Sequence, residues 1–257
     1  MKTSGFIVVV PAFNEARTVR DLARRALQYA DHVVVVDDGS TDGTAGRLAG
    51  LRVPVIRHPR NLGKAAALRA GIRWGLCRGS AIITMDADGQ HRPEDIPALR
   101  EAFDREPGAI VIGARVRNAS AIPLSRKVAH ATARFWISLA ARVAIGDSQS
   151  GFRLYPGSVL EALEGRCNWT NGFALESELL IEAGRLGIPI REVPIEALYH
   201  RRFRRSHYRQ FRDTWTITRM VTRKILRPRS PHSAVDFVAD GLFEDDSASR
   251  IEPRSYV

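Results

Sequence analysis

The sequence has little of what marks a secreted or membrane-spanning protein. It contains two cysteines, Cys77 and Cys167, in 257 residues. That is too few for a disulfide framework, so we expect a reducing, cytoplasmic environment. Only five apolar residues precede Pro11 in the first strand, fewer than the apolar region of a signal peptide contains. No window approaches the roughly 18 uninterrupted apolar residues of a membrane-spanning helix, so we expect no spanning segment.

A Gly-x-Gly-x-x-Gly sequence is also missing after the first predicted strand, which argues against a dinucleotide-binding protein. The chain is long enough to bury a large core, and its 44% hydrophobic content is ordinary for a globular protein. These features favour one compact catalytic unit.

Acidic residues are nearly absent from residues 201–229. This stretch has eleven Lys or Arg against one acid, Asp213, and so carries +10 of the chain's +11 net charge. One concentrated basic stretch indicates one anionic partner: a membrane, a phosphorylated substrate or a nucleic acid. A nucleic-acid-binding protein is the remote alternative, and we expect no nucleic acid partner, because the pattern of arginines and aromatics matches no module that reads DNA or RNA.

In the first half, short apolar runs alternate with stretches of helical spacing, which predicts a mostly parallel α/β sheet covered by helices on both faces. Strands are predicted at residues 5–10, 32–36, 53–57, 81–84 and 110–113, and helices at 15–27, 41–49, 63–78 and 93–104. The second half predicts a helix at 125–145, a polar loop at 147–153 entering a strand, a helix at 176–184 and an extended segment at 188–197. Helix 125–145 has an apolar stripe, for which packing in the core is favoured over lying at a membrane surface. The stripe consists of Val128, Ala131, Phe135 and Leu139.

Polar residues follow three of the predicted strands, in the segments 11–15, 37–40 and 86–90. The carboxyl ends of parallel strands meet at one edge of a sheet, so these segments should converge on one cleft. The acidic pair Asp86-x-Asp88 alone is a weak signal, because acidic pairs also form turns and helix caps. In a shared cleft its oxygens suit a divalent cation that bridges to a nucleotide's phosphates.

Six motifs occur in order along the chain: residues 11–15, 36–44, 61–64, 86–90, 147–153 and 192–195. The first four together resemble the family 2 glycosyltransferases of the GT-A fold, which is Rossmann-like. The last two are similar to the branch of dolichyl- and polyprenyl-phosphate mannosyltransferases. The resemblance covers about residues 5–210 and implies that a hexose, mannose or glucose, moves from a GDP- or UDP-sugar to a polyprenyl phosphate with inversion.

The resemblance implies a donor site at the carboxyl edge of the sheet. Asp88 and the side-chain oxygen of Gln90 would ligate Mg²⁺ or Mn²⁺, which makes Asp88 a candidate catalytic residue. For Lys64, a structural role is favoured over contact with a phosphate. The candidate nucleotide-sugar-binding residues are Pro11, Phe13, Glu15, Val36, Asp38, Asp86, Ala87, Asp88 and Gln90.

On the acceptor side, the resemblance assigns phosphate binding and a catalytic role to Arg115, and phosphate binding to Arg201, Arg202 and Ser206. A guanidinium suits a lipid phosphate, and a phosphate that is already ionised needs no general base. The runner-up is transfer to a non-phosphate acceptor (a small metabolite, another lipid or a protein hydroxyl), with Asp147 as the nearest candidate base.

Three departures from the family pattern bear on the acceptor side. Arg204 stands where a glycine is usual, and Asn171 stands where a lysine often precedes the glycine. The Gln-x-x-Arg-Trp signature of processive synthases is absent, which argues against polymer extension.

We divide the chain into four parts. Residues 1–115 form the donor-binding half and 116–210 the acceptor-binding half of one domain. Residues 211–229 are predicted as a basic amphipathic helix that faces an anionic membrane, with a domain-packing helix as the alternative. Residues 230–257 carry acids without periodicity and are predicted to be disordered. We therefore expect peripheral attachment at the inner face of the membrane.

Overall fold

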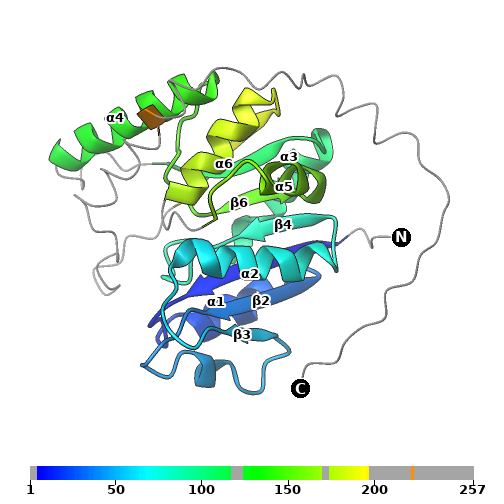
Figure 1. Ribbon diagram of the computed structural model, residues 1–257. Coiled ribbons are helices and arrows are strands. Elements are labelled where there is room, and N and C mark those ends of the chain that lie inside the picture. The colour runs from blue at the N-terminus through cyan, green and yellow to red at the C-terminus, as the bar shows by residue number, and fades with distance from the viewer. Residues whose placement is uncertain (1–4, 117–123, 170–173, 197–220, 223–257) are drawn as a thin grey trace. The chain divides into compact units, whose positions relative to one another are not determined.

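A computed structural model of the chain describes residues 5–116, 124–169, 174–196 and 221–222. Seven strands form one sheet in the order β3-β2-β1-β4-β6-β5-β7 (Figure 1). All neighbouring strands are parallel except β6, which runs antiparallel to β4 and β5. The mostly parallel α/β sheet is therefore confirmed. The strands are β1 (Phe6–Ala12), β2 (His32–Asp37), β3 (Val55–Arg57), β4 (Ala81–Thr84), β5 (Ile110–Val116), β6 (Arg153–Pro156) and β7 (Ile190–Glu196).

Helices cover both faces of this sheet, because alternate side chains of each central strand point to opposite sides. Ile7 and Val9 of β1 belong to one buried cluster with residues of α2, whereas Val8 and Val10 belong to another with residues of α1 and α3. On the first face α2 packs on β1, β2 and β4, and α5 and α6 pack on β6 and β7 (Figure 1). The helices are α1 (Val19–Ala26), α2 (Lys64–Leu76), α3 (Ile96–Arg105), α4 (Leu124–Ala141), α5 (Gly157–Glu164) and α6 (Ala174–Arg185), with short 3-10 turns η1 (Ala45–Leu48) and η2 (Pro93–Asp95).

The first strand and first helix differ from the sequence prediction. Strand β1 continues through Pro11, because β1 pairs with β4 only as far as Val9 and the missing N–H of Pro11 falls beyond that ladder. The predicted helix start at Glu15 is wrong, since α1 begins at Val19. Asn14 does not cap that helix. It has a positive φ of 57°, and its side-chain oxygen accepts a hydrogen bond from the backbone of Thr41.

Other differences lie in the helices. The helix predicted for residues 41–49 is only the 3-10 turn η1, because the side chains of Asp42 and Thr44 accept hydrogen bonds from the backbone of the loop after β1. Helix α5 has no counterpart in the prediction. Helix α4 forms as expected, but Phe135 and Leu139, which were placed in its core stripe, are 61% and 51% exposed.

The predicted basic helix at 211–229 and the tail at 230–257 lie outside the described residues, apart from positions 221 and 222. Those two are helical, and Val221 is 3% exposed within the cluster that contains α2 and α6. At this one position the observation favours the packing alternative. Among the described residues, no helix combines the length and the apolar character needed to cross a bilayer.

Candidate active site

The three polar segments that follow β1, β2 and β4 lie together at the carboxyl edge of the sheet, as predicted. The backbone N–H of Asn14 donates to Ser40 Oγ at 2.9 Å, and Thr41 N–H donates to Asn14 Oδ1 at 2.9 Å. From the start of α1, Thr18 Oγ1 donates to the carbonyl of Ala87 at 2.6 Å. These hydrogen bonds connect the three loops to one another, so the polar groups involved pair within the protein rather than with solvent. Because β6 is antiparallel, its amino end reaches the same edge and brings residues 147–152 there.

Asp37 and Asp38, at the end of β2, are both buried. The carboxylate of Asp38 accepts hydrogen bonds from the backbone N–H groups of Leu62 and Gly63, at 2.9 and 2.8 Å, and lies 2.7 Å from His58 Nδ1. Asp37 Oδ1 accepts from Ser40 N–H, while its buried Oδ2 makes no hydrogen bond and lies 3.4 Å from Arg57 Nε. The sequence analysis singled out Asp38 but missed this unsatisfied oxygen of Asp37.

The other predicted donor residues are placed unevenly around this edge. Val36 is fully buried and faces Gly71 of α2, so only its backbone can meet a ligand. Pro11 and Ala87 are also buried, whereas Phe13 and Glu15 are half-buried. Of the residues predicted to bind the nucleotide-sugar, some can therefore contribute only backbone atoms. A few have accessible side chains, chiefly Asp86, Asp88 and Gln90.

Lys64, at the first position of α2, connects the segment after β4 to α6. Its Nζ lies 2.7 Å from Asp86 Oδ1 and 2.8 Å from Glu176 Oε2. Burial opposes the charges of Lys64 and Asp86, but the two neighbouring carboxylates raise the pKa of Lys64, and Lys64 holds the pKa of Asp86 below its usual range. The structural role favoured for Lys64 agrees with this geometry. Glu176 was missed, although its signal was an acid inside an apolar helix whose Glu178 and Glu182 are also buried.

Within the part of the chain that the structure describes, no Lys, Arg or His side chain forms an ion pair with Asp88. Its Oδ1 accepts the backbone N–H of Gln90 at 3.0 Å, and burial, followed by the charge of Asp86, raises the pKa of Asp88 to about 6. A carboxylate whose ionised form is disfavoured in this way would gain from a bound cation. Together with the oxygens of a bound diphosphate, Asp88 and Gln90 would form a hard oxygen ligand set of the kind that Mg²⁺ and Mn²⁺ prefer. The residues therefore fit a cation that the donor helps to bind. Within the described ranges there is no cluster of three or more acidic, His or Cys side chains that could hold a metal without the donor.

His91 follows this segment and is 4% exposed, with its ring 5.5 Å from that of Phe152. Burial lowers the pKa of His91 to about 4, although the charge of Asp86 opposes the shift. The imidazole is thus neutral at neutral pH, and its buried Nδ1 has no hydrogen-bond partner.

Arg115, on β5, forms a two-pronged ion pair with Asp147. Its Nε lies 2.8 Å from Asp147 Oδ2, and its Nη2 lies 3.0 Å from Oδ1. Although burial opposes it, this pair holds the pKa of Asp147 far below its usual range. Gln149 N–H and Arg115 N–H also donate to the Asp147 carboxylate. Asp147 is thus poorly suited to the role of general base that the runner-up function gave it.

Arg153 is a buried cation that the sequence analysis did not single out. It is fully buried, and its guanidinium donates to the carbonyls of Ser150, Ser148 and Glu176 and to the hydroxyl of Tyr155. These bonds fix the loop before β6 against the first turn of α6. Arg201, Arg202 and Ser206, the remaining predicted acceptor residues, lie outside the described residues.

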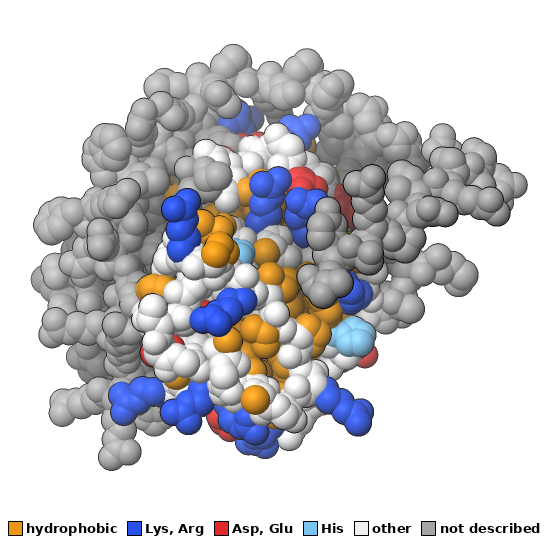
Figure 2. Space-filling view, turned by 60° about the horizontal axis from the view of Figure 1, so that its bottom comes forward, with side chains coloured by type: hydrophobic (Ala, Val, Ile, Leu, Met, Phe, Trp, Pro, Cys, Tyr) orange, Lys and Arg blue, Asp and Glu red, His pale blue; other side chains and the backbone are white. Residues whose placement is uncertain are grey.

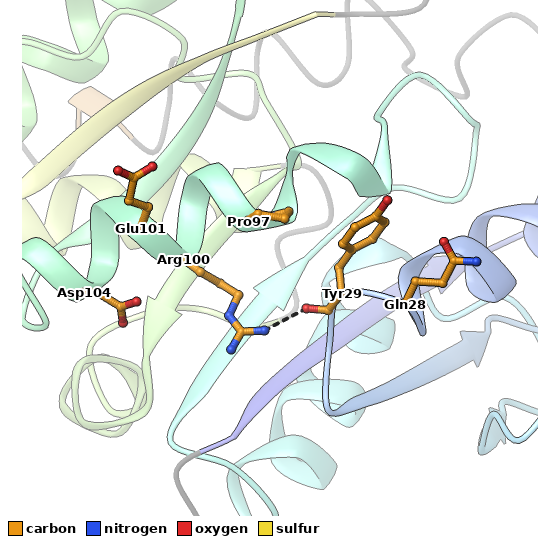
Figure 3. Close-up of a pocket in the computed structure, with 6 residues that line it drawn as sticks. All are labelled: Gln28, Tyr29, Pro97, Arg100, Glu101 and Asp104. Carbon is orange, nitrogen blue, oxygen red and sulfur yellow. Dashed lines mark hydrogen bonds between the residues drawn. The ribbon is translucent and has the colours of Figure 1, made fainter.

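A separate surface hollow of about 320 Å³ lies away from this edge (Figure 3). Residues after α1 and along α3 line it, and Arg100 crosses it to donate a hydrogen bond to the carbonyl of Tyr29 at 3.0 Å. In the view of Figure 2, Lys and Arg side chains are spread around exposed hydrophobic atoms rather than gathered in one continuous patch. Neither feature adds a reactive group to the candidate site.

A family model described as glycosyl transferase family 2 matches residues 7–161, more than half of the chain. The chain belongs to glycosyl transferase family 2. This family 2 glycosyltransferase is 34% identical over 206 residues to polyprenol monophosphomannose synthase of Mycolicibacterium smegmatis, covering 75% of this chain and 77% of that one. It is 29% identical over 214 residues to UDP-N-acetylglucosamine–dolichyl-phosphate N-acetylglucosaminyltransferase of Methanococcus voltae, covering 75% and 85%.

Solved structures confirm the fold of this glycosyltransferase. Glucosyl-3-phosphoglycerate synthase of Mycobacterium tuberculosis, solved with Mn²⁺, UDP-glucose and phosphoglyceric acid, superposes with a TM-score of 0.67 at 21% identity. The match covers 89% of this chain and 82% of the synthase. At this identity the likeness supports the GT-A-like fold alone, so it does not decide between a lipid phosphate and a small phosphorylated acid as acceptor.

Proposed function

We propose that this glycosyltransferase moves a hexose from a nucleotide-sugar to a polyprenyl phosphate. The observation that carries the proposal is the ion pair of Arg115 with Asp147. In this pair the guanidinium of Arg115 lies at the carboxyl edge of the sheet. The same pair lowers the pKa of Asp147, the nearest candidate base, and so makes Asp147 a poor base. An arginine at this edge whose neighbouring carboxylate is held ionised suits an acceptor that is itself an ionised phosphate, because such an acceptor needs no general base.

The named relatives support the same acceptor class. One is named for mannose and the other for N-acetylglucosamine, yet both names contain a polyprenol or dolichol carrier. The sugar thus varies among relatives while the phosphorylated lipid is kept. Because the relative at 34% identity is named for mannose, GDP-mannose is the first donor to test, followed by UDP-glucose.

In the proposed reaction an oxygen of the acceptor phosphate attacks the anomeric carbon. The bond from that carbon to the departing nucleoside diphosphate breaks as the new bond forms, so the anomeric centre inverts and no proton has to be removed. Asp38 and the backbone around Pro11 and Phe13 would hold the nucleoside, and Asp86 would lie beside the ribose and diphosphate. Arg115, with Arg201, Arg202 and Ser206, would orient the acceptor phosphate.

Asp88 and Gln90 would hold Mg²⁺ or Mn²⁺ together with the donor diphosphate. When bound, such a cation stabilises the negative charge that develops on the leaving group. The lipid acceptor also places the reaction at a membrane, and we assign it to the cytoplasmic face, with peripheral attachment of the protein.

Transfer of radiolabelled sugar tests this proposal. The purified full chain is incubated with GDP-mannose or UDP-glucose, Mg²⁺ or Mn²⁺, and either undecaprenyl phosphate in detergent or 3-phosphoglycerate. We expect label in the organic phase with the lipid only. Label on 3-phosphoglycerate alone would overturn the proposal. The variant Arg115→Ala should lose turnover with the lipid phosphate while it still binds the nucleoside diphosphate, and a variant that loses donor binding instead would contradict the role given to Arg115.

A further inference from the structure

Helix α4 exposes three large apolar side chains on one face. Phe135, Trp136 and Leu139 are 61%, 45% and 51% exposed, and the rings of Phe135 and Trp136 lie 5.3 Å apart in an edge-to-face arrangement. The opposite face is buried and packs on α6 (Figure 1) through Ile137, Ala140 and Ala141. We call the exposed trio, with the flanking Arg134 and Arg142, the α4 face.

Such an exposed cluster is unusual in this protein. Among the described residues, the only other large hydrophobic side chains of comparable exposure are those of Val55 and Leu62. Contiguous exposed aromatics on a soluble domain generally mark a binding surface. The position of Trp and Phe on an amphipathic helix is typical of contact with the interfacial region of a lipid bilayer.

The charge of α4 restricts the kind of partner that can bind its exposed face. The 18 residues of α4 include Arg126, Lys127 and Arg134 but no Asp or Glu, and the exposed Arg142 follows directly. A second copy that presented the same face would bring like charges together across a twofold interface. Anionic lipid headgroups complement this helix, because basic side chains near a membrane surface attract them.

The helix that carries the α4 face is connected to the acceptor side of the candidate site through β5 and α6. Seven residues, 117–123, join the end of β5 to the start of α4, and that connection spans at most about 28 Å when fully extended. Arg115 is near the end of β5. Helix α4 packs on α6, whose first turn contributes Glu176 to the Lys64 network.

We propose that the α4 face is the surface by which this protein docks on an anionic lipid bilayer, so that a membrane-embedded polyprenyl phosphate can present its headgroup to Arg115. This inference rests on the proposed function and names the surface it needs. It places the membrane contact on α4, for which the sequence analysis had favoured core packing over a membrane surface, rather than on residues 211–229.

Vesicle flotation tests the docking surface directly. The full chain is mixed at low salt with vesicles of phosphatidylcholine and phosphatidylglycerol, and the triple variant Phe135→Ser, Trp136→Ser and Leu139→Ser is compared with Val55→Thr. Val55 is exposed on β3 at the far edge of the sheet, so its variant is the matched control. We expect the triple variant to bind at least about tenfold more weakly, because membrane binding scales with buried apolar area, and Val55→Thr to bind as the natural chain does.

Two results would overturn the inference: a natural chain that fails to float with anionic vesicles, or a triple variant that floats as well as Val55→Thr does. The melting temperature of the triple variant serves as its folding control and should stay close to that of the natural chain, because the three side chains are exposed. Replacing Arg134 and Arg142 by Gln should weaken binding to anionic vesicles about tenfold and leave binding to pure phosphatidylcholine unchanged.

An activity comparison separates this inference from the proposed function. With a water-soluble short-chain polyprenyl phosphate, the triple variant should keep the natural rate. With undecaprenyl phosphate embedded in vesicles, it should lose most of its rate. If the natural chain glycosylates neither acceptor, the proposed function fails, while the flotation result still decides the docking surface. If the triple variant loses activity equally on both acceptors, the docking inference fails.

Discussion

Two parts of the sheet's carboxyl edge hold their carboxylates by different interactions. After β2, Asp37 and Asp38 accept three backbone N–H hydrogen bonds from the segments that follow, and His58 and Arg57 lie beside them. Around β5 and α6, the closest partners of Asp147 and Glu176 are the side-chain cations of Arg115 and Lys64, although Asp147 also accepts two backbone N–H groups. Lys64 pairs both with Asp86, in the segment after β4 on the proposed donor side, and with Glu176 of α6, so it joins the donor side of the edge to the acceptor side.

This difference suggests different tasks. Backbone hydrogen bonds fix a carboxylate through the fold itself, which suits a donor site that must be formed before the nucleotide arrives. A guanidinium has five N–H donors, so one that already holds a carboxylate can still be approached by a second anion. Under the proposed function, the acceptor side would combine fixed geometry with an affinity for phosphate. The predictions below test this comparison.

The largest expected effect comes from removing the cation that joins the two parts. The variant Lys64→Met leaves Asp86 and Glu176 buried without their partner, so its free energy of unfolding should fall by about 3–5 kcal/mol. Chemical denaturation measures this change. Arg69→Met on the same helix is the control, because Arg69 and Glu164 form an exposed pair at 3.8 Å and their loss should cost less than about 1 kcal/mol. Equal stability of the two variants would show that Lys64 does not join the two parts.

On the donor side, Asp88→Asn should lower kcat/KM by about 100-fold or more, equivalent to about 2.7 kcal/mol of transition-state stabilisation. The amide keeps the size of the side chain but removes the charge that a divalent cation needs. Turnover is measured against Mn²⁺ and Mg²⁺ concentration, and Asp104→Asn on α3 serves as the control. Full activity of Asp88→Asn in chelator-treated buffer would rule out the metal role of Asp88.

On the acceptor side, a double-mutant cycle with Arg115→Gln and Asp147→Asn should give a coupling energy of about 1–3 kcal/mol in stability. The pKa of Asp147 is lower in the folded protein than in the unfolded chain. The pair's contribution is therefore fully present above pH of about 4 and falls only as the pH drops toward the folded pKa. The cycle is measured by denaturation at pH 7. A coupling energy near zero would mean that the pair orients the two side chains without stabilising the folded protein.

The same comparison explains what the sequence could predict. Asp38, Asp86 and Asp88 directly follow apolar strands, so a local pattern and the rule for parallel sheets were enough to bring them to one edge. The pairing of Lys64 with Glu176 joins residues far apart in the chain and depends on how α6 packs, which no local pattern reveals. Arg153 was missed for a similar reason, since a buried arginine that donates mainly to carbonyls has no charged neighbour in the sequence.

Helix α4 shows a further limit of periodicity. Its apolar residues recur at helical spacing, and that spacing does not say whether a stripe faces the core or a partner. Ile137 and Ala140 face α6, whereas Phe135 and Leu139, which the pattern grouped as core, face outward. Only the structure separates the two faces, and this separation is what allows α4 to be proposed as a docking surface.

The smallest expected effect is at the end of the same helix. Arg142 is exposed and has a positive φ of 59°, a left-handed conformation that costs a residue with a Cβ about 1 kcal/mol. Glycine adopts this conformation without that cost and is the usual residue just after a helix. Arg142→Gly should therefore raise the free energy of unfolding by roughly 0.5–1 kcal/mol, measured without vesicles, while Arg134→Gly inside α4 should lower it by about 1 kcal/mol. Destabilisation by Arg142→Gly would show that the arginine side chain contributes more at this position than its backbone strain costs.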